Sequence, residues 1–214
     1  MARAPERPLP PRVSAPDLPD ELEDATGRRY GDHIGQRIPL AEDLAHAQFE
    51  QCSLTGAVDR ADLTGATLLD VEMVNIRAAV LSLKDATIRR LRISGGRIGT
   101  LDLSGAHVAE LIVEHARIDY LSLAAAKIQD SVIADCTLAT VDLPMAVATR
   151  VRFERSRADE VDTRGLRADS LDLRGLDALA FLDVTALHGA TLSFGQIELL
   201  APVFALAAGI DVQD

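Results

Sequence analysis

Four aspartates have a residue type and a spacing that suit the binding of another protein. Their positions differ by multiples of twenty, and they are Asp62, Asp102, Asp142 and Asp162. A structure that repeats every twenty residues would align them in one row on its surface. A row of carboxylates presents a fixed negative charge, which a positively charged protein surface can recognise. A solvated surface that keeps the protein soluble explains such a row equally simply, and the four aspartates are our candidate partner-binding residues beside that alternative.

The other reactive residue types lack the spacing of a catalytic or metal site. His107 and Asp102 project from different sides of a twenty-residue repeat, so their closeness in sequence is not closeness in space. The glycine-rich residues 94–99 lack the Gly-Lys-Ser/Thr ending of a phosphate-binding loop. The cysteines and histidines do not have the spacing of metal ligands. We therefore expect a protein that is not an enzyme and that binds no cofactor and no metal.

A five-residue period from about Leu44 to Leu192 determines how these aspartates are placed. Stepping by five from Val58 to Ala178 gives 25 positions, of which 19 are Val, Ile, Leu, Met or Phe. An amphipathic helix requires a period near 3.6 residues and a strand a period of 2, so neither alone explains this pattern. Short extended pieces that alternate with turns and wind into a solenoid do explain it.

Within each five-residue unit, strand geometry predicts which side chains face inward. The apolar centre and the residue two positions before it point into the solenoid, and the residue between them points outward. The outward residues include the four aspartates on one side. An adjacent side carries four arginines at the same spacing, namely Arg77, Arg97, Arg117 and Arg157. The frame also slips by one residue before Val58 and again after Ala178.

Three units show the motif most clearly: residues 61–65 (Ala-Asp-Leu-Thr-Gly), 101–105 (Leu-Asp-Leu-Ser-Gly) and 171–175 (Leu-Asp-Leu-Arg-Gly). They resemble the signature A-(D/N)-L-x-x of the pentapeptide-repeat family. The resemblance implies an all-β solenoid, a right-handed quadrilateral β-helix with four units per coil, over residues 41–192. With coils about 4.8 Å apart, it would form a rod about 35 Å long.

The first forty residues fall outside the repeat. Six of the nine prolines lie within the first nineteen positions, among charged residues and few large apolar ones. We expect residues 1–40 to form a Pro-rich, largely disordered tail. The sequence has neither the apolar core of a signal peptide nor eighteen consecutive apolar residues. It therefore predicts a cytoplasmic protein without a membrane partner.

Residues 193–214 change to a helical pattern. We expect a helix from Gln196 that is capped by Ser193, broken or kinked at Pro202 and ended by Gly209. It would cap the solenoid, whose last coil otherwise exposes apolar side chains and unpaired strand edges. In the quinolone-resistance members of the family, a similar segment joins two monomers. The resemblance therefore implies a homodimer, with simple capping as the alternative, and the candidate contacts are Ile197, Leu200, Val203, Phe204 and Leu206.

The net charge of −11 disfavours direct nucleic-acid binding, because phosphate contacts require clustered Lys and Arg. Two function classes remain. The first is a non-enzymatic scaffold, an acidic rod that binds a protein partner. The alternative comes from the resemblance: some family members mimic DNA, bind DNA gyrase and protect it from quinolone-type inhibitors. In that alternative, the four aspartates would act as the phosphate mimics.

Overall fold

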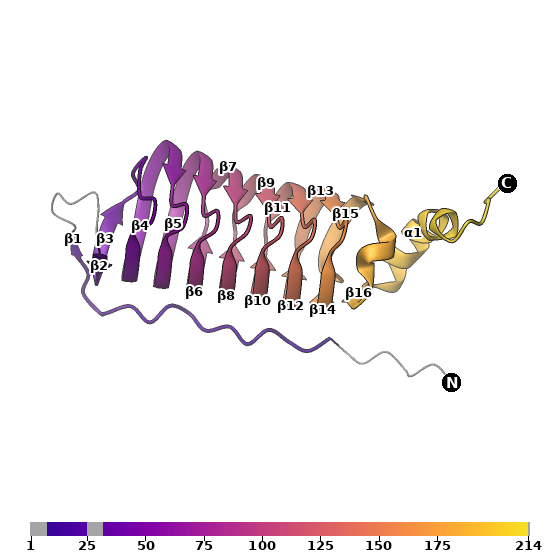
Figure 1. Ribbon diagram of the computed structural model, residues 1–214, viewed down its shortest axis with the longest axis horizontal. Coiled ribbons are helices and arrows are strands. Elements are labelled where there is room, and N and C mark those ends of the chain that lie inside the picture. The colour runs from indigo at the N-terminus through magenta and orange to yellow at the C-terminus, as the bar shows by residue number, and fades with distance from the viewer. Residues whose placement is uncertain (1–7, 25–31, 214) are drawn as a thin grey trace.

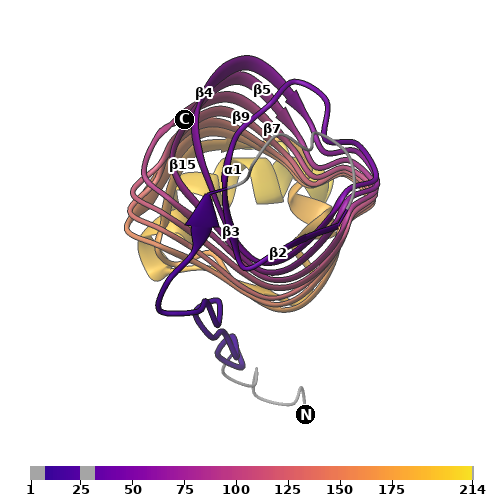
Figure 2. The same ribbon diagram turned by 90° about the vertical axis from the view of Figure 1, so that its left-hand side faces the viewer.

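The computed structural model describes residues 8–24 and 32–213 and shows a parallel β-solenoid with one C-terminal helix (Figure 1). Each strand pairs in parallel with the strands one coil before and one coil after it. In the view along the solenoid axis, the coils stack as nested rounded outlines around a common interior (Figure 2). The predicted all-β solenoid is confirmed.

The elements follow one another along the chain with short connections. They are β1 (Glu23–Asp24), β2 (Asp32–Ile34), β3 (Gln36–Pro39), β4 (Gln48–Asp62), β5 (Thr67–Ser82), β6 (Thr87–Ser94), β7 (Arg97–Asp102), β8 (His107–Glu114), β9 (Arg117–Ser122), β10 (Lys127–Ala134), β11 (Thr137–Asp142), β12 (Val147–Glu154), β13 (Ser156–Asp162), β14 (Arg167–Asp172), β15 (Leu176–Phe181), the 3₁₀-helix η1 (Val184–Leu187), β16 (Ala190–Thr191) and α1 (Phe194–Ala207). From β5 onward, two columns of strands climb the rod, β5-β7-β9-β11-β13-β15 and β5-β6-β8-β10-β12-β14-β16.

The register of the strands repeats every twenty residues. Along β8 and β10, for example, Val108 pairs with Ile128. The offset is nineteen at the start of the β4–β5 pair and becomes twenty after an irregularity between Thr55 and Ala57. It returns to nineteen between β14 and β16. The two frame slips predicted from the sequence are thus real, and each one is a coil one residue shorter than the others.

Burial follows the five-residue period. In β8, Val108, Leu111 and Val113 are buried, while the residues between them are partly exposed. The buried apolar side chains of all the coils form one continuous cluster along the axis. This explains why the period is five. Each side of a coil contributes two inward residues and one outward residue between them, and the turn between sides occupies the other two positions.

The solenoid begins earlier than the predicted residue 41. Strands β2 and β3, which lie within the predicted tail, pair in parallel with β4 at an offset of sixteen residues. The buried positions of this shorter coil, His33 and Ile38, are one residue out of the frame of Phe49 and Leu54 in the next coil, and one of the two is a histidine, so the period did not reveal the coil. Residues 8–22 are extended and run along the outside of the rod (Figure 1). The rest of the predicted tail, residues 1–7 and 25–31, lies outside the described residues.

Helix α1 closes the last coil. Ser193 caps it as predicted, because its hydroxyl accepts from the Gln196 N–H and the Gln196 side chain accepts from the Ser193 N–H. The Gln196 Nε2 also donates to the carbonyls of Leu173 and Leu176 at 2.8 and 2.7 Å, which ties the helix to the coil beneath it. Of the two alternatives predicted for Pro202, a break is wrong, since α1 continues through it to Ala207.

Candidate protein-binding surfaces

The four candidate aspartates do form one row, which we call the acid row. The strand register places Asp62, Ser82, Asp102, Ser122, Asp142 and Asp162 one above another on successive coils. Serine therefore alternates with aspartate until the last two members. The spacing between charges is two coils, about 9.6 Å, except between Asp142 and Asp162, which are one coil apart.

Most carboxylates of the acid row accept a backbone hydrogen bond in the turn that follows their strand. Asp62, Asp102 and Asp162 each accept a hydrogen bond from the backbone N–H two residues later, at 2.9 to 3.0 Å. This bond holds the turn that follows the strand. Asp142 lacks it, because residue 144 is a proline. Burial raises the pKa of Tyr120 to about 12, and the Asp142 carboxylate beside it adds to the rise.

Asp162 contributes little negative charge to the surface. Its side chain is 4% exposed and forms an ion pair with Arg164, and the pKa of Asp162 is lowered by that guanidinium. Asp172 and Arg174 form the same pair ten residues later. The charge of the acid row that reaches solvent therefore comes from its other three aspartates, which are partly exposed.

The arginine row lies on the adjacent side of the rod. The register aligns Arg77, Arg97 and Arg117 on three successive coils, and Arg157 follows after Thr137. Asp119 lies 4.0 Å from Arg97 and 3.4 Å from Arg117, between their guanidinium groups. These arginines remain exposed, at 66% for Arg97 and 59% for Arg117. The row thus combines exposed arginines with a partly exposed aspartate.

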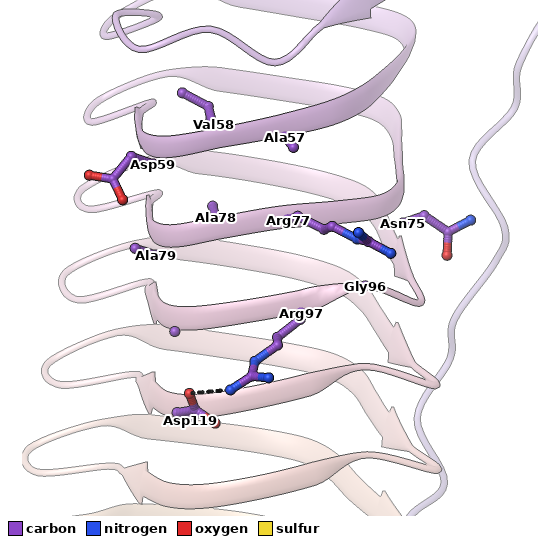
Figure 3. Close-up of a pocket in the computed structure, with 11 residues that line it drawn as sticks. Ala57, Val58, Asp59, Asn75, Arg77, Ala78, Ala79, Gly96, Arg97 and Asp119 are labelled. Carbon is purple, nitrogen blue, oxygen red and sulfur yellow. Dashed lines mark ion pairs between the residues drawn. The ribbon is translucent and has the colours of Figure 1, made fainter.

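A shallow depression accompanies the arginine row. Its floor consists of small residues, including Ala57, Ala79 and Gly96, and Arg77 and Arg97 stand beside it (Figure 3). Missing side chains create it, because Gly99 occupies an outward position where Asp119 stands one coil later. A carboxylate of a partner could be held there by two guanidinium groups.

A third feature, which the five-residue period did not indicate, is a set of acid–arginine pairs that bridge neighbouring coils. Arg90 binds Asp70, Arg150 binds Asp130 and Arg155 binds Asp135. Each guanidinium uses two nitrogens on both carboxylate oxygens, as in the Arg150 pair at 2.6 and 2.7 Å. The signal was present in the sequence, because each arginine follows its aspartate by twenty residues. In the structure all six residues lie at corners of the coil, where φ is positive.

These pairs predict a loss of stability in acid. Arginine hydrogen bonds lower the pKa of Asp70, Asp130, Asp162 and Asp172 below the ordinary value. A carboxylate whose pKa is lower when folded stabilises the fold above its unfolded pKa, near 4, and loses that contribution as the pH falls. We expect the midpoint of urea unfolding to be constant from pH 7 to about 5 and to fall steadily below pH 4. A midpoint that stays level down to pH 2 would contradict this.

Helix α1 divides the predicted dimer contacts between two faces. Leu200 is 7% exposed and packs on the solenoid core, with Phe204 partly buried beside it. Leu206 is 75% exposed and Val203 is 41% exposed, on another face. Ile197, at 42%, lies near the capping face. The sequence did not single out Leu199, which is 77% exposed and shares the face of Val203 and Leu206.

Among the described residues, no three His, Cys, Asp or Glu side chains gather in a geometry that could hold a metal ion. No helix within residues 8–24 and 32–213 is long and apolar enough to span a membrane.

Neither a protein-family model nor a curated protein matches the sequence. Among solved structures, the chain is similar to that of QnrB1, a plasmid-mediated fluoroquinolone resistance protein. The match covers 86% of this chain and 98% of that chain, at 14% identity and a TM-score of 0.26, values that carry no argument about function. The structure itself shows a parallel β-solenoid with a twenty-residue coil, which is the fold that the resemblance to the pentapeptide-repeat family implies.

Proposed function

We propose that this chain is a non-enzymatic, cytoplasmic scaffold that binds another protein through the sides of its rod. The observation that supports this best is the alignment of charged side chains in rows on successive coils. Each row repeats at the coil spacing of about 4.8 Å, so the sides present a fixed charge pattern to a partner. A rigid surface of this kind loses little conformational entropy on binding.

The arginine row and its depression are our first choice for the partner-binding side. Arg77 forms no ion pair with any described residue, and Arg97 is held only loosely, 4.0 Å from Asp119. Both guanidinium groups are therefore available for acidic groups of a partner. The acid row on the adjacent side would meet basic residues of the same partner, which would fix its orientation.

Charge reversal on two sides of the rod tests this proposal. We expect the parent chain to retain a cytoplasmic protein in near-stoichiometric amount. The Arg77→Glu/Arg97→Glu variant should retain at least tenfold less of that protein. Lys127→Glu/Arg167→Glu makes the same charge change at exposed positions of another side, without breaking an ion pair between described residues. If both variants retain equal amounts of the partner, the arginine row is not the partner-binding side. If the parent chain retains no protein, the scaffold function itself is rejected.

A DNA mimic that binds DNA gyrase is the second candidate, because the acid row is in register along the rod. Two findings rank it below the scaffold. One strand of DNA carries a charge every 3.4 Å, about three times as densely as the two-coil spacing of this row. The arginine row next to it also breaks the uniform negative field that a DNA mimic needs.

A gyrase supercoiling and quinolone-cleavage assay tests the second candidate. If it holds, the parent chain inhibits or protects gyrase, and Asp102→Asn/Asp142→Asn weakens the effect about tenfold or more. Asparagine keeps the oxygen that accepts from the Ser104 N–H, so only charge is lost. Asp177→Asn removes a charge on the side of the arginine row and should change nothing. No effect of the parent at micromolar concentration would reject gyrase as the partner.

We also propose a homodimer through the exposed face of α1. Leu199, Val203 and Leu206 form an apolar stripe, while Leu200 on another face packs on the core. A helix that is apolar all round is normally buried all round, so a second copy of the chain is the expected cover. The predicted contacts on Leu200 and Phe204 then act through capping, and those on Val203 and Leu206 directly.

The mass in solution distinguishes a dimer from simple capping. We expect light scattering to give twice the chain mass of 22.9 kDa for the parent. Leu199→Glu/Leu206→Glu should give a single-chain mass and keep a cooperative thermal transition, lowered only by the loss of the stabilisation that association provides. Ala201→Glu adds one charge to an exposed residue about 200° further around the helix, and should remain a dimer. A single-chain mass for the parent would mean that α1 only caps.

A further inference from the structure

An extended segment lies along one edge of the rod. Residues 8–20, which we call the strap, contain five prolines and no strand. The strap crosses the coils instead of following a strand, with its N-terminal end toward the C-terminal coils (Figure 1). A proline-rich chain favours the polyproline II conformation, which has no internal hydrogen bonds and leaves its backbone groups available.

Three backbone N–H groups of the strap donate to acidic side chains of the solenoid. The bonds are Arg12 to Asp130 Oδ1 at 2.9 Å, Ser14 to Glu110 Oε2 at 3.1 Å and Asp17 to Asp70 Oδ1 at 3.0 Å. Gln51 Nε2 donates in turn to the Asp17 carbonyl at 3.0 Å. These hydrogen bonds therefore involve the backbone of the strap rather than its side chains.

All four solenoid residues belong to one corner of the coil. The corner row, as we name it, has positive φ angles of 49 to 63° and consists of Gln51, Asp70, Arg90, Glu110, Asp130, Arg150 and Ser170. The register confirms the alignment, because the residues that flank this corner pair at an offset of nineteen or twenty. Corner residues point away from the core, which makes this edge a continuous polar track.

Arginines hold two of the acceptors in place. Arg90 binds both oxygens of Asp70, and Arg150 binds both oxygens of Asp130. The two arrangements are equivalent and lie three coils apart. With the strap in place, the Asp70 and Asp130 side chains are 6% and 8% exposed. Each oriented carboxylate keeps a lone pair on Oδ1 for the strap, so the site is preorganised before the strap binds.

The lengths of strap and track match. Polyproline II rises about 3.1 Å per residue, so the five residues from Arg12 to Asp17 span about 15.5 Å. The three coils from Asp130 to Asp70 span about 14.4 Å at 4.8 Å each. Two residues of the strap, from Arg12 to Ser14, correspond to the first coil, and three residues, from Ser14 to Asp17, correspond to the next two. No strand-like chain at about 3.4 Å per residue would keep this register as well.

The strap also presents a suitable face. Pro11, Val13, Pro16 and Leu18 are partly buried, whereas Ser14 and Ala15 are exposed. Prolines carry no N–H, so the many prolines leave few donors, and three of these lie over acceptors of the corner row. The sequence thus supplies apolar contact, a stiff extended backbone and correctly placed donors in one short segment.

We propose that the corner row is a binding site for an extended, proline-rich chain, recognised through its backbone N–H groups, and that the strap occupies this site in cis. The proposal goes beyond the scaffold function and does not depend on it, because it concerns another edge of the rod. The site accepts a chain of defined conformation and spacing, and its resident occupant must leave before any other such chain can bind.

Amide-proton exchange of the full chain, measured by NMR, is the first test. We expect the Arg12, Ser14 and Asp17 amides to exchange at least tenfold more slowly than the Val13 and Ala15 amides, after correction for intrinsic rates. Within one segment, only a docked strap produces this alternation. Uniformly fast exchange over these five amides would overturn the proposal.

Proline substitutions provide a matched pair of variants. Ser14→Pro/Asp17→Pro removes two donors and should abolish the protection of the Arg12 amide. Ala15→Pro removes an N–H that donates to no described group, and should leave that protection intact. All three positions are exposed and extended, so the fold itself should not change. Equal loss of protection in both variants would show that proline stiffness, not hydrogen bonding, governs the contact, and would overturn the proposed recognition.

A labelled peptide of residues 8–20 then tests whether the site accepts a chain in trans. The tethered strap competes at an effective concentration near millimolar, so the parent should bind the peptide weakly. The Ser14→Pro/Asp17→Pro chain should bind it at least tenfold more tightly than the parent or the Ala15→Pro chain. A peptide that itself carries both prolines should not bind. Equal binding of the two peptides, or none to the opened chain at millimolar concentration, would contradict a site for such chains.

Discussion

Leu103→Arg is expected to abolish cooperative folding of the rod. Leu103 is fully buried, and its backbone N–H donates to the Ser122 carbonyl of the next coil at 2.8 Å. The substitution places an unpaired guanidinium among apolar side chains, where Leu83 and Leu123 lie one coil away on either side. Burying such a charge costs several kcal/mol beyond the lost leucine contacts. The free energy of unfolding of a natural protein domain is only about 5–15 kcal/mol in total.

Far-ultraviolet circular dichroism during heating measures this effect. We expect the variant to show no cooperative transition, or one at least 15 °C below that of the parent. Leu103→Met keeps the volume and apolarity and should cost less than about 1.5 kcal/mol. Asp102→Asn, one residue away on the outward face, should leave the transition unchanged. A Leu103→Arg protein that melts like the parent would show that the inward frame is wrong.

Gly96→Ala is expected to destabilise the rod strongly although it adds only one methyl group. Gly96 has a φ of 95°, which disfavours any residue with a Cβ. A Cβ would also lie 2.2 Å from the Ile76 carbonyl oxygen and 2.8 Å from the Ile76 nitrogen. The two coils cannot simply separate, since β5 and β7 pair directly after these residues, with Arg77 beside Arg97. On its other side, the Gly96 carbonyl accepts from the Arg117 N–H of the next coil. We expect a loss of about 3 kcal/mol or more.

Chemical denaturation of Gly96→Ala and of a second glycine variant tests this expectation. Gly195, in the first turn of α1, would place a Cβ in open space, and its φ is not in the positive range. Because alanine favours helix over glycine, Gly195→Ala should be neutral or stabilising by up to about 1 kcal/mol. If Gly96→Ala proves as harmless as Gly195→Ala, the coils do not approach as closely as described.

The inward frame and the rows of the rod could be predicted because a solenoid is nearly one-dimensional. Once the period is five and the coil is twenty residues long, the positions of Asp62, Asp102 and Arg97 on its sides follow by counting. The first coil could not be predicted in this way, because β2 and β3 pair with β4 at an offset of sixteen. Low apolar content suggested disorder for the tail, and the amide exchange of the strap is the test of that prediction.

The charge state of the rows required the tertiary structure. Counting places Asp162 on the acid row, yet only side-chain packing shows that Arg164 pairs with it and that little of it reaches solvent. The sequence likewise shows that α1 is mostly apolar, but it does not show which of its residues pack on the solenoid core. The structure assigns Leu200 to the cap and leaves Leu206 exposed.

The sequence by itself determined the solenoid, its twenty-residue coil and its aligned rows, because burial of every fifth side chain is a local and repeated requirement. Only the tertiary structure decided which charges are paired, which face of α1 is covered and which corner holds the strap. Those outcomes depend on groups far apart in the chain, such as Arg12 and Asp130. Their distance and orientation are set by the stacking of coils, and no local pattern encodes them.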